Sequence, residues 1–345
     1  MKKTMVRRSL LGATALSLLA PLVGCAASES ATNGLTDMSF RLEFSPSGKF
    51  APYYYADSEG YYKDEGLDVS IQPGKGSVVT GQEITAGKVD IGSMACSTMA
   101  LQVGQGADLV SVGLTVGKLS LTTFVPEDSD ASTAYDLEGK QVIVTAASLE
   151  TPLMPALFAL GDINGDRVEL MNVDAASKVS TYAAGRGDAV VTSLPLSKPT
   201  LDKERPSKAL LWADAGMSMP DFCLVTTQQT LEEREDDIEA FLRATYRGFK
   251  DATANPEDAV AELTRAEPAA ASPTAQETFE LWSQFYCSDD QVEKKMPFGQ
   301  NSSNDWQQGV ELLKEHAELA PDVESDSLFD NRFFTERNVS DVTCS

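Results

Sequence analysis

The stretch APYYYADSEGYYKDEGLDVSI, residues 51–71, carries the signals that decide the fold. Residues 51–65 have the pattern of an amphipathic helix, and Gly66 can take the left-handed conformation that ends one. Leu67 then begins a run that alternates apolar and polar residues as far as Ile71, which is the period of a half-buried strand. A helix followed at once by a strand is typical of an α/β architecture.

The same alternation extends on both sides of that stretch. Apolar runs predict strands at 38–44, 67–71, 89–92, 109–112, 141–144, 168–171, 188–191, 208–212 and 222–226. Helical patterns cover 51–65, 78–86, 97–102, 152–160, 175–184, 231–253, 256–266, 274–286 and 304–319. Because short connections join the alternating elements, and the pattern restarts after Pro126, we expect two α/β units with mainly parallel sheets flanked by helices and a helical C-terminal portion.

The N-terminus has the residue order of a signal peptide over residues 1–24. A basic region precedes the apolar run 10–22, which is shorter than the about 20 residues that span a bilayer. Leu22-Val23-Gly24-Cys25 is similar to the lipobox of bacterial lipoproteins, so we expect a lipid attached at Cys25. The pair Arg7-Arg8 leaves general and twin-arginine export both open. Residues 25–37 are small and polar and should form a flexible tether.

The net charge of the chain limits which kinds of partner it can bind. The chain holds 28 basic and 52 acidic residues, for a net charge of −24. Such a charge argues against binding to nucleic acid and to anionic membranes, and it favours a soluble monomer after the anchor.

Four cysteines remain besides Cys25, and an extracytoplasmic compartment permits disulfides between them. They are Cys96, Cys223, Cys287 and Cys344. Three connectivities are possible and the sequence does not choose among them. Cys287–Cys344 is favoured because both residues fall in the same predicted domain. The spacings do not suggest a zinc site.

Five segments resemble one family when they are read in order. They are APYYYA (51–56), GYYKDEGLDV (60–69), GKVDIG (87–92), DLEGK (136–140) and GDA (187–189). They are similar to the extracytoplasmic substrate-binding proteins of uptake ABC transporters, in the group that binds nitrate, sulfonates or thiamine-pyrimidine precursors. The resemblance covers roughly residues 38–230.

The resemblance implies a type II periplasmic-binding fold with two lobes. Lobe 1 would hold residues 38–124 and 225–345, and lobe 2 would hold residues 126–223. Two crossover segments would act as a hinge, and a ligand would bind between the lobes. That position agrees with the general rule for open α/β sheets, in which ligands sit beyond the carboxyl ends of the strands.

The loops at those strand ends supply the candidate ligand contacts. Their Ser and Thr hydroxyls lie near expected helix starts, where free N–H groups favour a polar or anionic group, although N-capping alone could explain each one. Aromatic residues of the first loop could line a pocket for a flat ring. The expected ligand-binding residues are Phe44, Ser47, Phe50, Tyr53, Gly76, Ser77, Ser93, Cys96, Ser97, Thr145, Ser148, Thr151, Thr192 and Ser193. Trp212 is expected in the core of lobe 2.

The sequence lacks the usual signatures of catalysis. His316 is the only histidine, no Ser or Cys has an evident His partner, and neither a G-x-S-x-G elbow nor a Walker loop occurs. We therefore expect no enzyme, no cofactor and no metal site.

The expected function is capture of a small organic solute on the outer face of the cell membrane and delivery to an ABC permease. A thiamine-precursor pyrimidine or similar heteroaromatic fits the aromatic loop, and an alkanesulfonate or nitrate fits the hydroxyl-rich loops. Two other functions stay open: an enzyme on the same fold, such as a pyrimidine synthase, and a ligand sensor for a membrane receptor.

Overall fold

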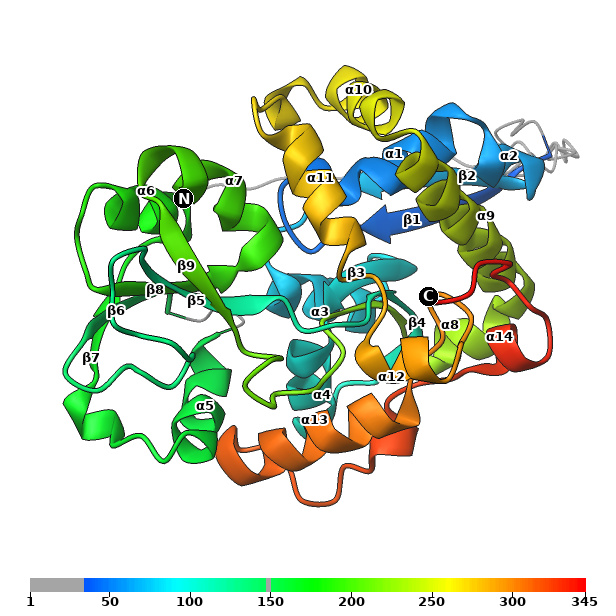
Figure 1. The fold of residues 1–345 in the computed structure, drawn as a ribbon. Coiled ribbons are helices and arrows are strands. Elements are labelled where there is room, and N and C mark those ends of the chain that lie inside the picture. Colours follow the sequence, from blue (N-terminus) through cyan, green and yellow to red (C-terminus); the bar gives the residue numbers. More distant parts are fainter. Residues whose placement is uncertain (1–33, 147–149) are drawn as a thin grey trace, which may run out of the picture. The chain divides into compact units, whose positions relative to one another are not determined.

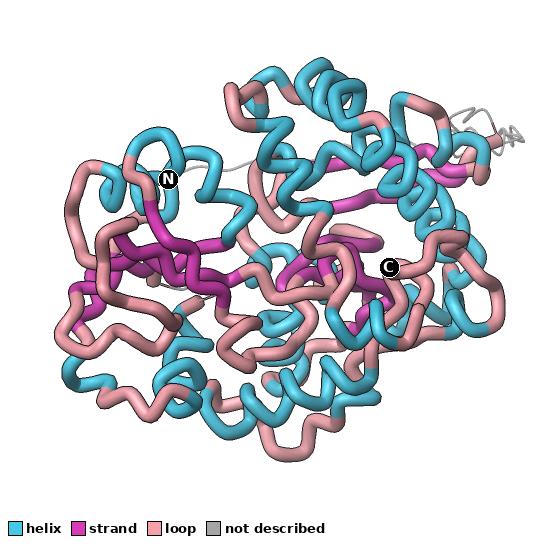
Figure 2. Tube along the Cα trace, viewed as in Figure 1, coloured by secondary structure: helices cyan, strands magenta, loops and turns pink. Residues whose placement is uncertain are grey.

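Two five-stranded sheets with helices around each make up the part of the chain that the computed structural model describes, residues 34–146 and 150–345 (Figure 1). The predicted signal peptide, the lipid-attachment residue Cys25, most of the predicted tether and the candidate contact Ser148 lie outside those residues. Figure 2 shows the strands of Leu35–Ser345 as two separate groups.

The first sheet has the order β2-β1-β3-β10-β4. Its strands are β1 (Thr36–Arg41), β2 (Leu67–Gln72), β3 (Ile91–Ala95), β4 (Val110–Val116) and β10 (Phe222–Thr226). β1 pairs in parallel with β2 and β3, whereas β10 is antiparallel to both β3 and β4. β10 is thus a single reversed strand among four that point the same way.

The second sheet has the order β7-β6-β8-β5-β9 and repeats this arrangement. Its strands are β5 (Leu121–Pro126), β6 (Gln141–Val144), β7 (Glu169–Asn172), β8 (Ala189–Ser193) and β9 (Ser207–Leu211). β6 pairs in parallel with β7 and β8, and β5 is antiparallel to β8 and β9. The predicted α/β class with mainly parallel sheets is confirmed, with one reversed strand in each sheet.

The reversed strands correct the predicted lobe boundaries. All of β5 belongs to the second sheet, so the chain leaves the first sheet at residues 117–120 and not near Val125. Likewise, Phe222 and Cys223 pair within the first sheet, although the prediction assigned them to lobe 2. The reason is that both apolar segments are hydrogen-bonded between two neighbouring strands, a tertiary arrangement that local pattern does not reveal.

The helices alternate with the strands as predicted, and some predicted helices are divided. The α-helices are α1 (Ala51–Ser58), α2 (Tyr61–Asp64), α3 (Ser77–Thr85), α4 (Cys96–Gly104), α5 (Met154–Leu160), α6 (Lys178–Ala183), α7 (Leu194–Glu204), α8 (Gln228–Glu233), α9 (Glu235–Ala254), α10 (Pro256–Ala266), α11 (Ala275–Ser283), α12 (Asp289–Glu293), α13 (Ser303–His316) and α14 (Arg332–Thr335). Short 3₁₀ helices are η1 (Gly48–Phe50), η2 (Thr151–Leu153), η3 (Gly165–Arg167), η4 (Ala175–Ser177), η5 (Pro268–Ala270) and η6 (Ser325–Ser327). Gly60, with φ of +77°, separates α1 from α2 within the single helix expected at 51–65.

Helix α13 connects the cores of the two α/β units. One continuous apolar cluster contains Leu114 of β4, Val142 of β6 and Trp306 of α13. The helix packs against both α4 and α5, and in Figure 1 it runs in orange beneath them. Trp212 is fully buried in the same cluster, as predicted, and its Nε1–H donates to Thr123 Oγ1 at 2.9 Å.

Two disulfides cross-link the described residues. Cys287–Cys344 has a Cα–Cα distance of 5.8 Å, which confirms the favoured pair. The second disulfide joins Cys96, the first residue of α4, to Cys223 of β10. It therefore fixes the reversed strand of the first sheet to the helix that follows β3.

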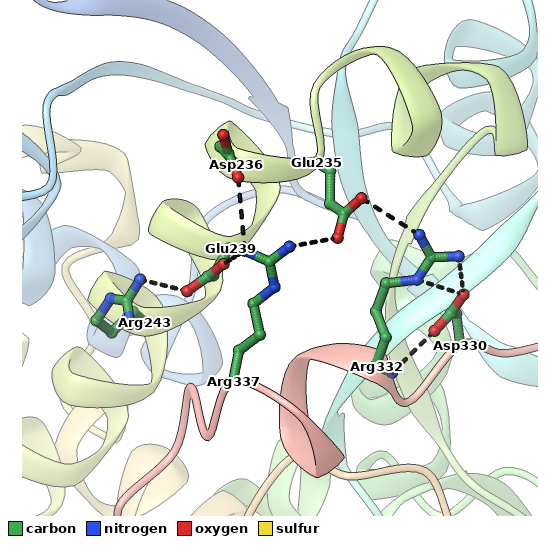
Figure 3. Close-up of polar contacts among 7 residues, drawn as sticks. All are labelled: Glu235, Asp236, Glu239, Arg243, Asp330, Arg332 and Arg337. Carbon is green, nitrogen blue, oxygen red and sulfur yellow. Dashed lines mark hydrogen bonds and ion pairs between the residues drawn. The ribbon is translucent and has the colours of Figure 1, made fainter.

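An ion-pair network ties the end of the chain to α9 (Figure 3). Arg337 contacts Glu235 at 2.8 Å and Glu239 at 2.7 Å. Arg332 contacts Asp330 at 2.7 Å and reaches Glu235 at 3.5 Å. With Cys287–Cys344, these contacts hold the last segment against the first α/β unit. No helix in the described ranges has the length and apolarity needed to cross a membrane.

Candidate functional site

Asp221 and Ser120 mark the place where the carboxyl-terminal edges of the two sheets meet. Asp221 precedes β10, whose first residue, Phe222, pairs with the last residues of β3 and β4. Ser120 precedes β5, whose first residue, Leu121, pairs with Ser193 at the end of β8. The Ser120 N–H donates to Asp221 Oδ2 at 3.0 Å, so one hydrogen bond joins the two edges. Ligands of open α/β sheets bind at such edges.

A buried ion pair lies at the edge of the first sheet. Lys49 Nζ donates to Glu43 Oε1 at 2.5 Å, and both residues are buried. The same ammonium stands 2.9 Å from the ring centroid of Phe222 and 4.8 Å from that of Trp282. Burial lowers the pKa of Lys49, while the charges of Glu43 and Asp221 oppose that shift. The lysine is therefore enclosed by two aromatic faces and two carboxylates.

The Asp221 carboxylate is buried with only part of its hydrogen-bonding capacity used. Burial raises its pKa to about 6 and Glu43 adds to the rise, while Ser120 and Lys49 oppose it. Its Oδ1 has no hydrogen-bond partner among the residues that the structure describes. A buried acceptor without a partner costs about 1–3 kcal/mol, and more when it is charged. This cost falls on an atom at the junction of the two sheet edges.

Substitution of Asp221 is expected to stabilise the ligand-free protein. A carboxyl pKa that folding raises from 3.8 to about 6 opposes folding fully above pH 6, and the effect disappears below pH 4. The shift corresponds to an upper bound of about 3 kcal/mol. Urea unfolding of Asp221→Asn should therefore show a gain in unfolding free energy at pH 8 that shrinks at pH 4.5. An equal difference at the two pH values would mean that the carboxylate is not the cause.

Two further polar atoms lie buried in the same region of the first lobe. Ser97 Oγ and Trp282 Nε1 have no hydrogen-bond partner within the described ranges. Ser97 is the second residue of α4, next to Cys96, whose N–H donates to the backbone oxygen of Asp221 at 2.9 Å. Trp282 packs edge-on against Phe222, with ring centroids 5.8 Å apart.

The second sheet contributes its own polar edge. Lys178 Nζ donates to Glu150 Oε1 at 2.5 Å, and both residues are buried. The Thr145 N–H donates to the same oxygen at 3.1 Å, and Thr145 directly follows β6. This buried pair lies where the loops after β6 and β7 approach each other, so each sheet has one ion pair at its carboxyl edge.

The predicted aromatic contacts lie in different surroundings. Phe44 is 51% exposed, whereas Tyr53 is in the first core, where its ring packs against Phe40 and Phe249. Phe50 is buried, with its ring centroid 5.4 Å from Lys49 Nζ. The aromatic surfaces beside the charged groups therefore come mainly from Phe222 and Trp282, which the sequence did not nominate.

The predicted polar contacts of the first lobe have varied partners. Ser93 Oγ donates to Glu43 Oε2 at 3.5 Å, and Ser77 Oγ accepts from the backbone of β3 at 2.9 Å. The Gly76 N–H donates to the Glu43 backbone oxygen at 2.6 Å, with φ of +107°. Ser47 precedes η1 and makes no side-chain cap. The Cys96 sulfur is bonded to Cys223, so it is not a free thiol that could meet a ligand.

The predicted contacts of the second lobe lie along its carboxyl edge. Ser193 Oγ accepts from Ser120 Oγ at 3.0 Å, so it belongs to the junction of the two sheets. Thr192 Oγ1 lies 2.9 Å from Ser197 Oγ, and Thr151 Oγ1 donates to the Thr145 backbone oxygen at 2.7 Å. The structure thus brings Ser93, Ser97 and Ser193 to the regions around the charged groups.

The main residues that the sequence reading missed are Glu43, Lys49, Asp221, Phe222 and Trp282. Glu43 directly precedes the first loop, and Lys49 lies within it. The sequence could have pointed to them, because each is a charged residue in a stretch of mainly uncharged residues. Asp221 had no such signal, because it reaches the edge only through the reversed direction of β10. No group of residues suited to a metal ion occurs in the described parts of the chain.

The second α/β unit also has a surface hollow, away from the buried charged residues. It has a volume of about 380 Å³ and its lining includes Tyr135, Lys140 and Asp162. These residues precede β6 and β7, so they lie at the amino-terminal edge of that sheet. The hollow is therefore separate from the edges that hold the buried charges.

Comparison with known proteins gives consistent matches. A family described as "NMT1/THI5 like" matches residues 47–259. A formylaminopyrimidine-binding protein of Halalkalibacterium halodurans is 24% identical over 323 residues, which cover 91% of this chain and 97% of that protein. A 4-amino-5-hydroxymethyl-2-methylpyrimidine phosphate synthase of Uromyces fabae is also 24% identical, over 74% of this chain and 75% of the enzyme.

A solved structure agrees with the fold. The periplasmic nitrate-binding protein of Synechocystis PCC 6803 superposes with a TM-score of 0.67 at 13% identity, over 88% of each chain. At that identity the likeness concerns the fold alone, which is the two-lobed periplasmic-binding architecture.

Proposed function

Because this chain belongs to the NMT1/THI5-like family, we propose that it is an extracytoplasmic solute-binding protein that captures a small heteroaromatic solute between its lobes and delivers it to an ABC importer. The observation that carries the proposal is the buried polar set at the junction of the two sheets. Glu43, Lys49 and Asp221 are too costly to bury together for stability alone. A binding function accounts for that cost.

The chemistry of the edge favours a flat ring that donates hydrogen bonds. Phe222 and Trp282 bring aromatic rings to this edge, which a ring could contact once Lys49 shifts, and Glu43 and Asp221 bring carboxylate oxygens. Nitrate or an alkanesulfonate would be repelled by the two carboxylates of this edge, since Lys49 already donates to Glu43 and stands beside the second carboxylate. The similarity to a formylaminopyrimidine-binding protein supports the same ligand class. A pyrimidine or related heteroaromatic is therefore the favoured solute.

Contacts on two sides of the junction suit closure of the lobes around a ligand. α13 packs against both α4 and α5, within an apolar cluster that continues through both α/β units. α11 packs against α7, where Lys203 Nζ approaches Glu277 Oε2 at 3.5 Å between exposed side chains. An exposed ion pair of this kind contributes little stability, so it can form and break with little cost. Opening is thus expected on the α11–α7 side, with α13 as the fixed side.

Export and anchoring complete the proposal. A signal peptide over residues 1–24 and a lipid at Cys25 would hold the protein on the outer face of the membrane. A short tether raises the effective concentration of the binding protein beside its permease.

Two other roles have less support. The similarity to the Uromyces fabae synthase favours an enzyme, but the chain has a single histidine, His316, which ends α13 and approaches Glu315. A sensor role would use the same ligand site and would differ only in the membrane partner.

A solute panel tests the ligand class directly. Thermal unfolding of the purified protein is measured with 4-amino-5-hydroxymethyl-2-methylpyrimidine, nitrate and ethanesulfonate. A pyrimidine at 100 times its Kd should add about 2.7 kcal/mol to the unfolding free energy and raise Tm accordingly. Stabilisation by nitrate or ethanesulfonate alone would contradict the heteroaromatic assignment.

A further inference from the structure

Resting on the proposed solute-binding function, we propose that Asp221 Oδ1 is the specificity-determining contact of the site and takes a ligand nitrogen that carries a hydrogen. The ligand would be a heteroaromatic compound with an exocyclic amino group or an amidine-like edge. It would be neutral or protonated, and anions would be excluded. The proposal stands on charge balance, on the unpartnered atom and on the rigidity of its position.

The charges at the edge do not balance without a ligand. Glu43 and Asp221 are two buried carboxylates, and among the described residues Lys49 is the one cation that both of them face. Lys49 Nζ donates to Glu43 at 2.5 Å, whereas no hydrogen bond joins that ammonium to Asp221 within the described residues. Glu43, Lys49 and Asp221 together therefore carry a net negative charge, and the carboxylate of Asp221 is the group whose charge is not paired. A buried charge of this sign calls for a donor or a cation.

The hydrogen bonds of Asp221 leave one atom available. Oδ2 accepts from the Ser120 N–H at 3.0 Å, whereas Oδ1 has no partner in the described parts of the chain. Asp221 itself is 1% exposed, so bulk water does not satisfy Oδ1 in this arrangement. One free carboxylate oxygen matches one N–H donor.

The backbone that carries this carboxylate is held by three contacts. Its backbone N–H donates to Val116 at 3.1 Å, and its backbone oxygen accepts from Cys96 at 2.9 Å. The Cys96–Cys223 disulfide then connects the two segments covalently. A preorganised acceptor loses little entropy when a ligand binds, and it discriminates strongly against a ligand that lacks the donor.

The aromatic faces fit the same ligand. Phe222 follows Asp221 directly in the chain, and Trp282 packs edge-on against it. A heteroaromatic ring beside these side chains would present an exocyclic amino group toward the neighbouring carboxylate. Lys49 at present covers the Phe222 ring, so ring stacking there requires the lysine to shift.

Isothermal titration with a matched ligand pair tests the inference. The first probe is 4-amino-5-hydroxymethyl-2-methylpyrimidine, and the second is its analogue with methyl in place of the 4-amino group. The wild-type protein is expected to bind the amino compound about 100-fold more tightly, because the methyl analogue leaves Oδ1 buried and unpartnered. Asp221→Asn should weaken binding of the amino compound at least about tenfold and reduce the preference to about tenfold or less.

Asp214→Asn is the matched control, since Asp214 is exposed in the same crossover segment and should leave both affinities unchanged. Circular dichroism and thermal unfolding confirm that the variants are folded. Equal binding of both probes by the wild type, or a full preference in Asp221→Asn, would overturn the inference and leave heteroaromatic binding standing. Failure of the wild type to bind either probe would overturn the proposed ligand class as well.

Discussion

Removal of the Cys96–Cys223 disulfide is expected to cause the largest loss of stability that a change at the site can produce. The disulfide spans 127 residues, and the chain-entropy model gives about 5 kcal/mol for a loop of that length. The Cys96→Ala/Cys223→Ala protein should therefore unfold at markedly lower denaturant concentration than the oxidised wild type. Solute affinity should fall as well, because the pair fixes the segments on either side of Asp221. Guanidinium unfolding and isothermal titration measure the two effects.

The other disulfide provides the matched control. Cys287–Cys344 spans 57 residues, for which the same model gives about 4 kcal/mol. It joins the end of the chain to the segment after α11, whereas Asp221 lies directly before β10. Cys287→Ala/Cys344→Ala should lose comparable stability and keep its solute affinity under conditions where it is folded. Equal losses of affinity in both variants would contradict a specific role for Cys96–Cys223.

Replacement of Lys49 is expected to have the next largest effect. Lys49→Met leaves Glu43 and Asp221 buried without their cation, and breaking a buried pair in this way costs about 3–5 kcal/mol. The loss should shrink as the pH falls below 6, because the pKa of Asp221 is already raised to about 6 and the missing lysine raises it further. Urea unfolding at pH 8 and pH 5 measures this dependence.

A double variant separates loss of the charge partner from loss of packing. Glu43→Gln/Lys49→Met removes both members of the pair and should recover most of the stability that Lys49→Met loses at pH 8. If the double variant is as unstable as Lys49→Met, the lysine stabilises the protein by packing against Phe222 and Trp282 rather than through charge.

Local signals in the sequence were strong enough to predict most elements of the fold. The strands 141–144 and 222–226 and the helix 256–266 have the predicted bounds, since each is an uninterrupted pattern between clear breaks. Gly66 takes φ of +82° after α2, as expected for a residue that ends a helix.

Proline explains two of the elements that the sequence reading missed. Pro126 was interpreted as a break between units, but it is the last residue of β5 and pairs with Ser207 of β9. Pro195 and Pro199 lie within α7, a helix that the sequence analysis did not predict. Pro195 lies in the first turn of α7, where a missing N–H costs little, and Pro199 lies inside the helix.

The charged part of the site depends on contacts between distant segments. Asp221 is hydrogen-bonded to Ser120, which lies 101 residues away in the sequence. Lys49, Phe222 and Trp282 contact one another although they come from three separate parts of the chain. Loops that follow parallel strands could be nominated from the sequence, and two of the nominated residues, Ser93 and Ser193, make hydrogen bonds at those sheet edges. Residues that precede a reversed strand or lie on α11 could not be nominated in this way, because their positions in space depend on the order and direction of the strands in the sheet.

Hydrogen–deuterium exchange of the whole protein with and without the pyrimidine tests the central claim most directly. Capture of a solute between the lobes predicts slower exchange in segments of both lobes, at 43–50, 93–97 and 221–222 in the first and at 120 and 192–193 in the second. Slower exchange confined to one lobe, for instance to the hollow at 130–140 and 161–163, would contradict it.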